Sequence, residues 1–128
     1  SLVGSEMCIR DRLYRVQKEI IHDMAAKSPC VIIGRGADYI LRNNDRLLSV
    51  FVIADKETKV ENVTAHYNLD RESALELMKK TDKQRKNYYN AYTDYKWGDI
   101  TNYNMVLDRS KFGIDGCVEI LKAAYDAL

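Results

Sequence analysis

The sequence gathers its cationic side chains in one stretch, residues 79–97, which is also rich in aromatic residues. Six basic residues stand there against two acidic ones, which gives the stretch a net charge of +4. The charged residues are Lys79, Lys80, Lys83, Arg85, Lys86 and Lys96, with Asp82 and Asp94. Cations beside aromatic faces suit an anionic ligand that carries a ring. The alternative is a solvated helix face whose tyrosines pack into the core.

Two charged residues of this stretch, Asp82 and Arg85, are three residues apart and therefore share one face of a helix. A carboxylate at this spacing can orient the guanidinium, and an oriented cation is well placed to bind phosphate. Lys83 adds a further positive charge beside them. The alternative is an exposed salt bridge, which contributes roughly a few tenths of a kcal/mol.

A second candidate anion site is Arg35, which lies between two glycines, Gly34 and Gly36. The apolar residues 30–33 precede it and predict a buried strand of a parallel sheet. Ligands of open α/β sheets bind beyond the carboxyl ends of the strands. The glycines allow a close backbone approach, and the guanidinium offers a bidentate fork. The alternative is a tight turn with a solvent-facing arginine.

Strands that alternate with helices position these groups. Apolar runs predict strands at residues 30–33, 47–53 and 103–107, and helical periodicity predicts helices at 13–27, 37–42, 56–67, 71–92 and from 113 onward. The first helix is amphipathic, with Leu13, Val16, Ile20 and Met24 on one stripe. Asp55 and Asp70 are expected to cap their helices. We therefore predict an α/β fold, a parallel sheet flanked by helices, in which helix 71–92 carries the basic stretch away from the sheet as a lid.

Length and composition limit the functional classes. The 128 residues suffice for one domain, and the net charge of +1 argues against a broad nucleic-acid-binding surface. The longest apolar run is too short to span a membrane, and no metal site is expected because the two histidines lack partners at ligand spacing. Three cysteines without paired spacing suggest a reducing compartment, and we expect the cytoplasm.

In this order, the motifs resemble those of the cytidylate kinase-like proteins, which are P-loop nucleoside monophosphate kinases, from about Leu13 to the end. Residues 31–36 match the family's strand followed by Gly-Arg, residues 82–85 match the lid motif Asp-basic-x-Arg, and residues 103–110 with 112–115 match the last strand, polar turn and final helix. Tyr88-Tyr89 and Trp97-Gly98-Asp99 look like the cytidylate kinase-like branch rather than the standard enzyme.

The resemblance implies a role for each matching residue. Arg35, with Gly34 beside it, would contact the phosphate of the acceptor nucleoside monophosphate. Asp82 would support the acceptor side of the site. Arg85 would close with the lid onto the transferring phosphoryl group, with Lys83 as a neighbouring cation.

The resemblance also implies the other ligands. Asp108, Arg109 and Ser110 would lie near the base of the donor nucleotide. ATP and Mg²⁺ would be required, and the partners would be small-molecule nucleotides. Phosphoryl transfer needs little covalent help and much neutralisation of charge, which mobile Arg and Lys side chains supply.

Two departures from the family pattern affect this expectation. Gly36 stands where the standard enzyme has Asp after Gly-Arg, and the sequence contains no G-x-x-x-x-G-K-[ST] phosphate loop. Residues 1–12 look like translated sequencing adapter, so we expect a non-native start, with residues 13–128 forming the C-terminal part of the domain and the lid at about 79–97. The first strand and the P-loop would then be missing.

Three functions remain open from the sequence. The first is a parent enzyme that converts ATP and CMP to ADP and CDP, of which this chain alone would be inactive. The second is a non-catalytic module that binds a nucleotide or phosphate. The third, disfavoured by the near-neutral charge, is a single-stranded nucleic-acid binder that uses the Tyr/Lys stretch. The oligomeric state does not follow from the sequence.

Overall fold

The computed structural model of the protein describes residues 8–128. The chain forms two compact units, Ser1–Asp45 and Arg46–Leu128, and each is described by itself. No helix within the described residues is both long and apolar enough to cross a membrane.

The first unit contains the helices α1 (Ile9–Lys27) and α2 (Ala37–Ile40), which are in contact. The Sγ atom of Cys8 accepts a hydrogen bond from the Asp11 N–H at 3.4 Å, and this cap starts α1 four residues before the predicted position. The helix ends at Ser28 because the proline that follows disfavours a helical conformation there.

The predicted strand at residues 30–33 is wrong. The segment is irregular, and the side chains of Val31 and Ile33 are 90% and 88% exposed. A strand requires a neighbour that supplies ladder hydrogen bonds, and no segment among residues 8–128 pairs with this one. The apolar stripe of α1 is also largely exposed, at Leu13, Val16, Ile20 and Met24.

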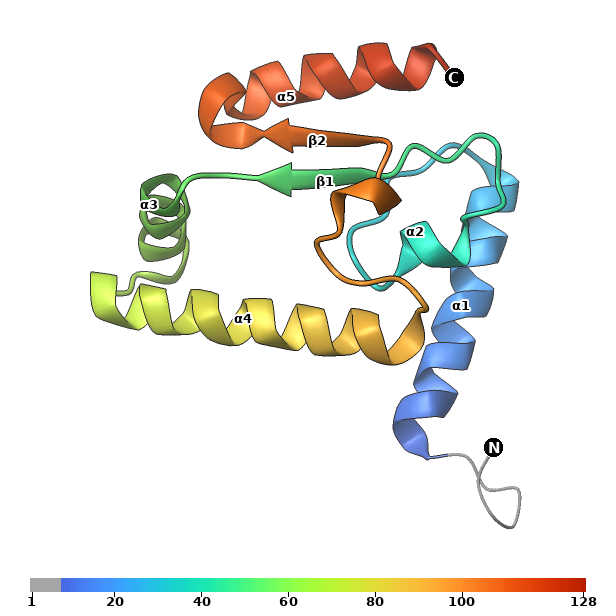
Figure 1. Cartoon of the computed structure of the whole chain (residues 1–128), viewed down its shortest axis with the longest axis horizontal. Helices are drawn as coiled ribbons and strands as arrows, with labels where there is room; N and C mark the ends of the chain where they lie inside the picture. The colour runs from blue at the N-terminus through green and yellow to red at the C-terminus, as the bar shows by residue number, and fades with distance from the viewer. Residues whose placement is uncertain (1–7) are drawn as a thin grey trace. The chain divides into compact units, whose positions relative to one another are not determined.

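The second unit is built on two parallel strands, β1 (Val50–Ile53) and β2 (Met105–Asp108), in which Ile53 pairs with Asp108 (Figure 1). Ser49 and Asn104 align the start of the strands. The Asn104 Oδ1 accepts from the Ser49 N–H, and the Ser49 carbonyl accepts from the Asn104 N–H, each at 2.8 Å. The sequence predicted both strands and their parallel arrangement, but it began each of them too early.

Two helices follow β1, namely α3 (Lys56–Tyr67) and α4 (Arg71–Tyr92), and the predicted caps of both are confirmed. The carboxylates of Asp55 and Asp70 accept hydrogen bonds from backbone N–H groups three residues on, each at 2.7 Å. These hydrogen bonds favour the ionised carboxylates and lower the pKa of each below its ordinary value.

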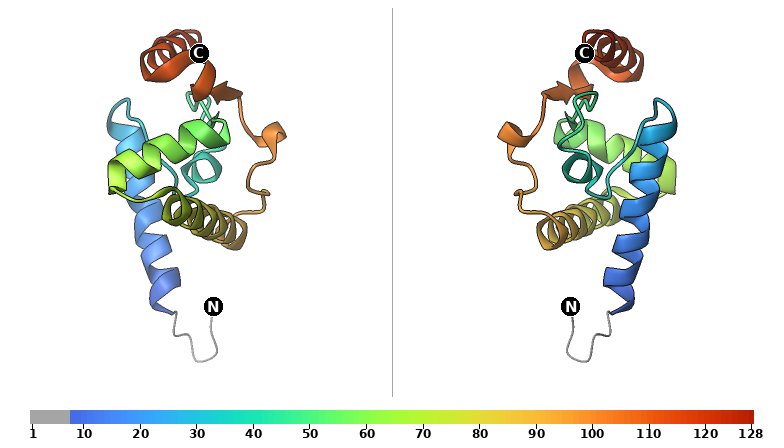
Figure 2. Two further views of the ribbon diagram at one scale, coloured as in Figure 1. Left: turned by 90° about the vertical axis from the view of Figure 1, so that its left-hand side faces the viewer. Right: turned by 90° about the vertical axis from the view of Figure 1, so that its right-hand side faces the viewer.

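The last helix, α5 (Arg109–Asp126), begins before the predicted position because Asp108 caps it directly after β2. Its first turn is set off by a kink at Gly113, where φ is 69° and ψ is 177°. The helix then runs back along the sheet, and Figures 1 and 2 show it on the opposite side of the strands from α4.

Aromatic residues join the segment after α4 to the sheet. The ring of Phe51 on β1 lies 5.8 Å from the ring of Trp97 and 4.9 Å from that of Tyr103, and a short 3-10 helix, η2 (Ile100–Asn102), lies between those two residues in the sequence. Tyr89 is buried. The unit is thus a mixed α/β structure, with a small two-stranded parallel sheet and helices among its described residues.

Candidate functional site

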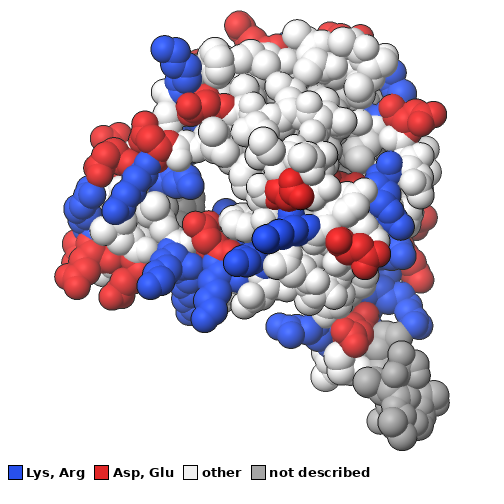
Figure 3. Space-filling model, in the orientation of Figure 1, with Lys and Arg blue, Asp and Glu red and all other residues white. Residues whose placement is uncertain are grey.

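The cationic stretch singled out in the sequence lies mostly on the second half of α4. Ala74 and Tyr89 are buried and fix which face of α4 points inward, so the charged residues between them project into solvent. Figure 3 shows Lys and Arg side chains gathered over this helix. The helix is a single unbroken element, as predicted, because Asp70 caps its start and no Gly or Pro interrupts it.

The three predicted lid residues, Asp82, Lys83 and Arg85, are all exposed on α4. No ion pair or hydrogen bond joins Asp82 to Arg85 in the part of the chain that the structure describes, so the expected orientation of Arg85 by Asp82 is absent. An exposed pair at this spacing gains little in water and does not hold two flexible side chains together. Arg85 is therefore a solvated cation in this structure.

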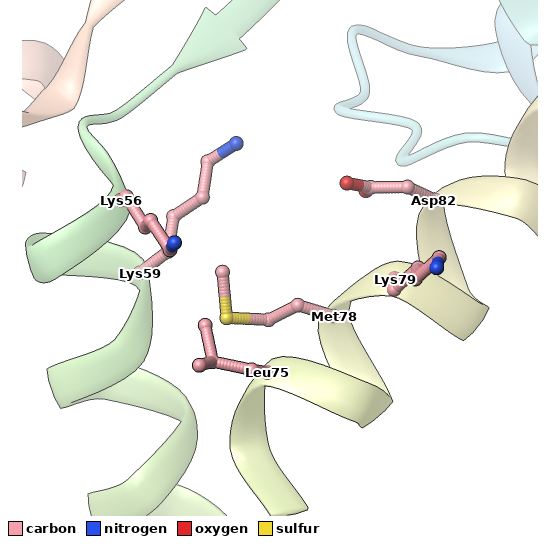
Figure 4. A pocket seen from close by; sticks show the side chains of 6 residues that line it. All are labelled: Lys56, Lys59, Leu75, Met78, Lys79 and Asp82. Atoms are coloured by element: carbon pink, nitrogen blue, oxygen red, sulfur yellow. The ribbon is translucent and has the colours of Figure 1, made fainter. Parts of the chain in front are cut away.

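Asp82 instead lines a hollow of about 480 Å³ between α3 and α4. The other lining residues are Lys56, Lys59, Leu75, Met78 and Lys79. In Figure 4, Leu75, Met78 and Asp82 point from α4 toward α3. The lining of the hollow thus comprises one acidic, two apolar and three basic residues.

An ion pair joins the two helices. The Arg71 guanidinium donates to both carboxylate oxygens of Glu57, at 2.7 and 2.9 Å. These hydrogen bonds are the main reason that the pKa of Glu57 lies below its ordinary value. The bidentate pair joins the first turn of α3 to the first turn of α4.

The Gly-Arg-Gly segment lies in the first unit and has an uncommon backbone. Gly34, Arg35 and Gly36 all have positive φ, at 70°, 60° and 67°. Gly36 is buried at the start of α2, whereas the side chain of Arg35 is exposed. A left-handed conformation is strained for a non-glycine residue, and such strain is typically found where the structure fixes a side chain for a purpose.

The predicted polar turn at residues 108–110 is the first turn of α5. The Asp108 carboxylate accepts from the Ser110 N–H at 2.9 Å, and the Ser110 Oγ accepts from the Asp55 N–H at 2.7 Å. Ser110 therefore connects the carboxyl ends of β1 and β2, while Arg109 is half-buried beside it. The structure gives Asp108 and Ser110 a clear local role in holding this edge of the sheet.

The structure brings some of the predicted site residues together and adds two others. Asp82, Lys83 and Arg85 share α4, and residues 108–110 belong to the same unit, whereas Gly34 and Arg35 belong to the first unit. Lys56 and Lys59 were missed by the sequence analysis. Their spacing of three residues, beside the inward-facing Val60, is the one signal that could have indicated a basic edge on α3.

The described residues offer no ready metal site. No group of three or more His, Cys, Asp or Glu side chains within residues 8–128 could hold a metal ion. We therefore assign no Mg²⁺ ligand in this chain. The lysines around the hollow, by contrast, fit the charge of a phosphate.

A family model, curated proteins and a crystal structure are similar to this chain. A model of the cytidylate kinase-like family matches residues 1–111, which includes the segment that the sequence analysis set aside. A cytidylate kinase of Methanocaldococcus jannaschii is 27% identical over 108 residues, and one of Pyrococcus furiosus is 32% identical over 106 residues. The crystal structure of an uncharacterized protein from Eubacterium ventriosum superposes with a TM-score of 0.88 at 33% identity.

Each match covers a larger share of this chain than of the protein to which it is compared. The alignments cover 83% and 81% of this chain but only 61% and 54% of the two cytidylate kinases. The crystal structure is matched over 94% of this chain and 76% of its own length. Because the family model covers most of the chain, the protein belongs to the cytidylate kinase-like family.

Proposed function

We propose that the protein of which this chain forms a part transfers the γ-phosphoryl group of ATP to a nucleoside monophosphate, with CMP as the acceptor. The observation that carries the proposal is the family match over residues 1–111, which includes the Asp-basic-x-Arg motif at residues 82–85. The exposed cations on α4 supply the positive charge that phosphoryl transfer requires.

Each predicted site residue has a separate role in the proposed reaction. Arg35, held by a strained backbone between two glycines, binds the phosphate of the acceptor. Arg85 stabilises the charge that develops on the transferring phosphoryl group, and Lys83 adds to the same field. Asp82 accepts hydrogen bonds from the acceptor side of the site.

Arg85 has to move in this proposal, and its surroundings permit that. Its side chain is exposed and is free of ion pairs within residues 8–128, so no bond has to break before it turns toward a ligand. The exposed second half of α4 is the segment that we assign as the lid, which excludes water when it closes. Residues 108–110 lie near the donor base in this assignment.

The proposed reaction also requires a phosphate loop, which this sequence does not contain. The sequence lacks G-x-x-x-x-G-K-[ST], and we propose that a preceding segment of the longer protein provides this loop and the first strand. Mg²⁺, when bound, would neutralise charge on the donor phosphates. The chain by itself is then inactive. The three free cysteines are consistent with a cytoplasmic protein.

A second candidate function is a module that binds a nucleotide without transferring phosphate. Such a module would use cations such as Arg35 and Arg85 to bind phosphate and would need no phosphate loop. To test the two, the product of the intact gene is incubated with ATP, Mg²⁺ and each of CMP, UMP, AMP and GMP, and formation of the nucleoside diphosphate is measured. The kinase proposal predicts the fastest turnover with CMP. Binding of CMP without any diphosphate would favour the module.

A further inference from the structure

Ser110 connects the carboxyl ends of the two strands through two hydrogen bonds. Its Oγ atom accepts from the Asp55 N–H at 2.7 Å, and its own N–H donates to the Asp108 carboxylate at 2.9 Å. Asp55 caps α3 shortly after β1 ends, and Asp108 is the last residue of β2. Figure 1 shows that both strands end on the side where α3 and α5 begin. One serine thus joins the start of α3 to the turn between β2 and α5.

The Asp55 N–H is a donor that a helix usually satisfies locally. In a capping box, a Glu or Gln three residues after the cap reaches back to this N–H. Helix α3 has Thr58 at that position, and the acceptor is instead Ser110, which lies 55 residues further along the chain. The start of α3 is therefore fixed to another element of the fold.

The hydroxyl of Ser110 also lies close to the Asp55 carboxylate. The backbone hydrogen bond from Thr58 is the main reason that the pKa of Asp55 lies below its ordinary value of 3.8, and the side chains of Thr58 and Ser110 lower that pKa further. A serine hydroxyl has a single proton to donate. Because Asp55 engages this half-buried hydroxyl, a ligand would have to displace Asp55 in order to receive its proton.

We propose that Ser110 is a positioning residue for the donor nucleotide, which holds the turn at residues 108–110 in place against α3 and does not itself contact the base. The assignment of this turn to the donor rests on the proposed function, whereas the link between the turn and α3 rests on the two hydrogen bonds. Ligands of parallel α/β sheets bind beyond the carboxyl ends of the strands, where this link lies. Without the link, the turn has to be ordered during binding, and that cost weakens the complex.

The link itself is tested in the 128-residue chain by NMR measurement of amide hydrogen exchange at Asp55. Ser110→Ala should raise the exchange rate of this amide roughly three- to tenfold, because the N–H loses its acceptor. Ser110→Thr, which keeps a hydroxyl, should stay within about twofold of wild type. The matched control is Thr64→Ala, which removes a hydroxyl whose hydrogen bond, to the Glu61 carbonyl at 3.0 Å, stays within α3. Equal exchange in Ser110→Ala and wild type would overturn the proposal.

The positioning role is tested in the intact protein by calorimetric titration with ATP. Ser110→Ala should weaken binding roughly three- to tenfold, and Ser110→Thr should restore it. Asp55→Pro removes both the N–H and the carboxylate that face Ser110, and the φ of Asp55, −67°, suits proline. In the Asp55→Pro background, Ser110→Ala should therefore weaken ATP binding no further. A loss of the same size in both backgrounds would overturn the proposal, because Ser110 would then contact the nucleotide directly.

Initial rates with ATP and CMP separate this proposal from the proposed function. Ser110→Ala should raise the KM for ATP and change kcat less than about twofold, as expected for a loss of binding that is uniform along the reaction. ATP binding and turnover that are unchanged in Ser110→Ala would overturn the positioning role and leave the kinase standing. Weaker ATP binding in Ser110→Ala that Ser110→Thr restores, without phosphoryl transfer in wild type, would support the positioning role and overturn the kinase.

Discussion

At the scale of single residues, the cations of the candidate site are side chains that form no ion pair among the described residues. Arg85 and Lys79 project from α4 without ion pairs among the described residues, while Arg71 on the same helix is fully paired with Glu57. Arg71 joins α3 to α4 through its ion pair, whereas the side chains of Arg85 and Lys79 can bind a ligand. Charge type alone does not separate these roles in the sequence, whereas the contacts do.

Replacement of Arg85 by Gln tests the role of the lid cation in the intact protein. We expect kcat to fall about 100-fold or more, because the lost charge acts on the transferring phosphoryl group. Lys86→Gln, which removes a neighbouring exposed charge, should change kcat less than about threefold. Initial rates at saturating CMP and ATP provide the measurement, and equal losses in both variants would contradict the assignment.

The cap of α4 makes a prediction about pH. The hydrogen bond from the Ser73 N–H lowers the pKa of Asp70 in the folded protein below its ordinary value of 3.8. The stabilisation is therefore complete above that value and is lost as the pH falls through the lowered pKa of the folded state. Asn caps a helix as well as Asp does but carries no charge.

Thermal unfolding of wild type and Asp70→Asn measures this contribution. The wild type should have the higher Tm at about pH 7, and the difference should shrink by about pH 3. A difference that stays constant across this range would show that the charge of Asp70 does not contribute. Asp70→Ala, which also loses the hydrogen bond, should unfold at a lower temperature than either protein at about pH 7.

At the scale of secondary structure, local signals were sufficient for some elements and not for others. The N-terminal ends of α3 and α4 could be predicted from Asp55 and Asp70, because a cap accepts a hydrogen bond from the backbone only three residues away. The strand expected at residues 30–33 required a distant neighbour, which composition cannot supply. The hollow was missed for the same reason, since residues of α3 and α4 line it together only after the two helices pack.

Gly113 provides a test of the kink in α5. Its backbone, with φ of 69° and ψ of 177°, falls in a region that is almost exclusive to glycine, although a Cβ there would have open space around it. Gly113→Ala should therefore lower the free energy of unfolding by about 1–3 kcal/mol through backbone strain alone. Urea denaturation gives the value, and an unchanged midpoint would contradict the assigned conformation.

The aromatic contacts of β1 can be followed by fluorescence, because Trp97 is the sole tryptophan in the sequence. Its ring lies edge-on to Phe51 at 5.8 Å. Phe51→Leu should shift the emission of Trp97 to longer wavelength, since the indole loses an aromatic neighbour and gains water. Tyr88→Leu, on α4, serves as the control, and equal shifts in both variants would contradict the proposed anchoring.

At the scale of the whole molecule, the chain matches only part of the length of its relatives. It spans 54% to 61% of the two cytidylate kinases described above. The parallel pairing of β1 and β2 and the order of elements after them support the α/β class inferred from the sequence. The donor-phosphate loop and the CMP preference are proposals about the longer protein.

The central claim is phosphoryl transfer to CMP, and the most direct measurement follows the phosphoryl group itself. The intact protein is incubated with CMP, Mg²⁺ and ATP labelled at the γ-phosphate. We predict that the label appears in the β-phosphate of CDP, that Arg85→Gln abolishes most of this transfer, and that the 128-residue chain alone produces none. Release of the label only as inorganic phosphate, or no transfer to any nucleoside monophosphate, would contradict the account.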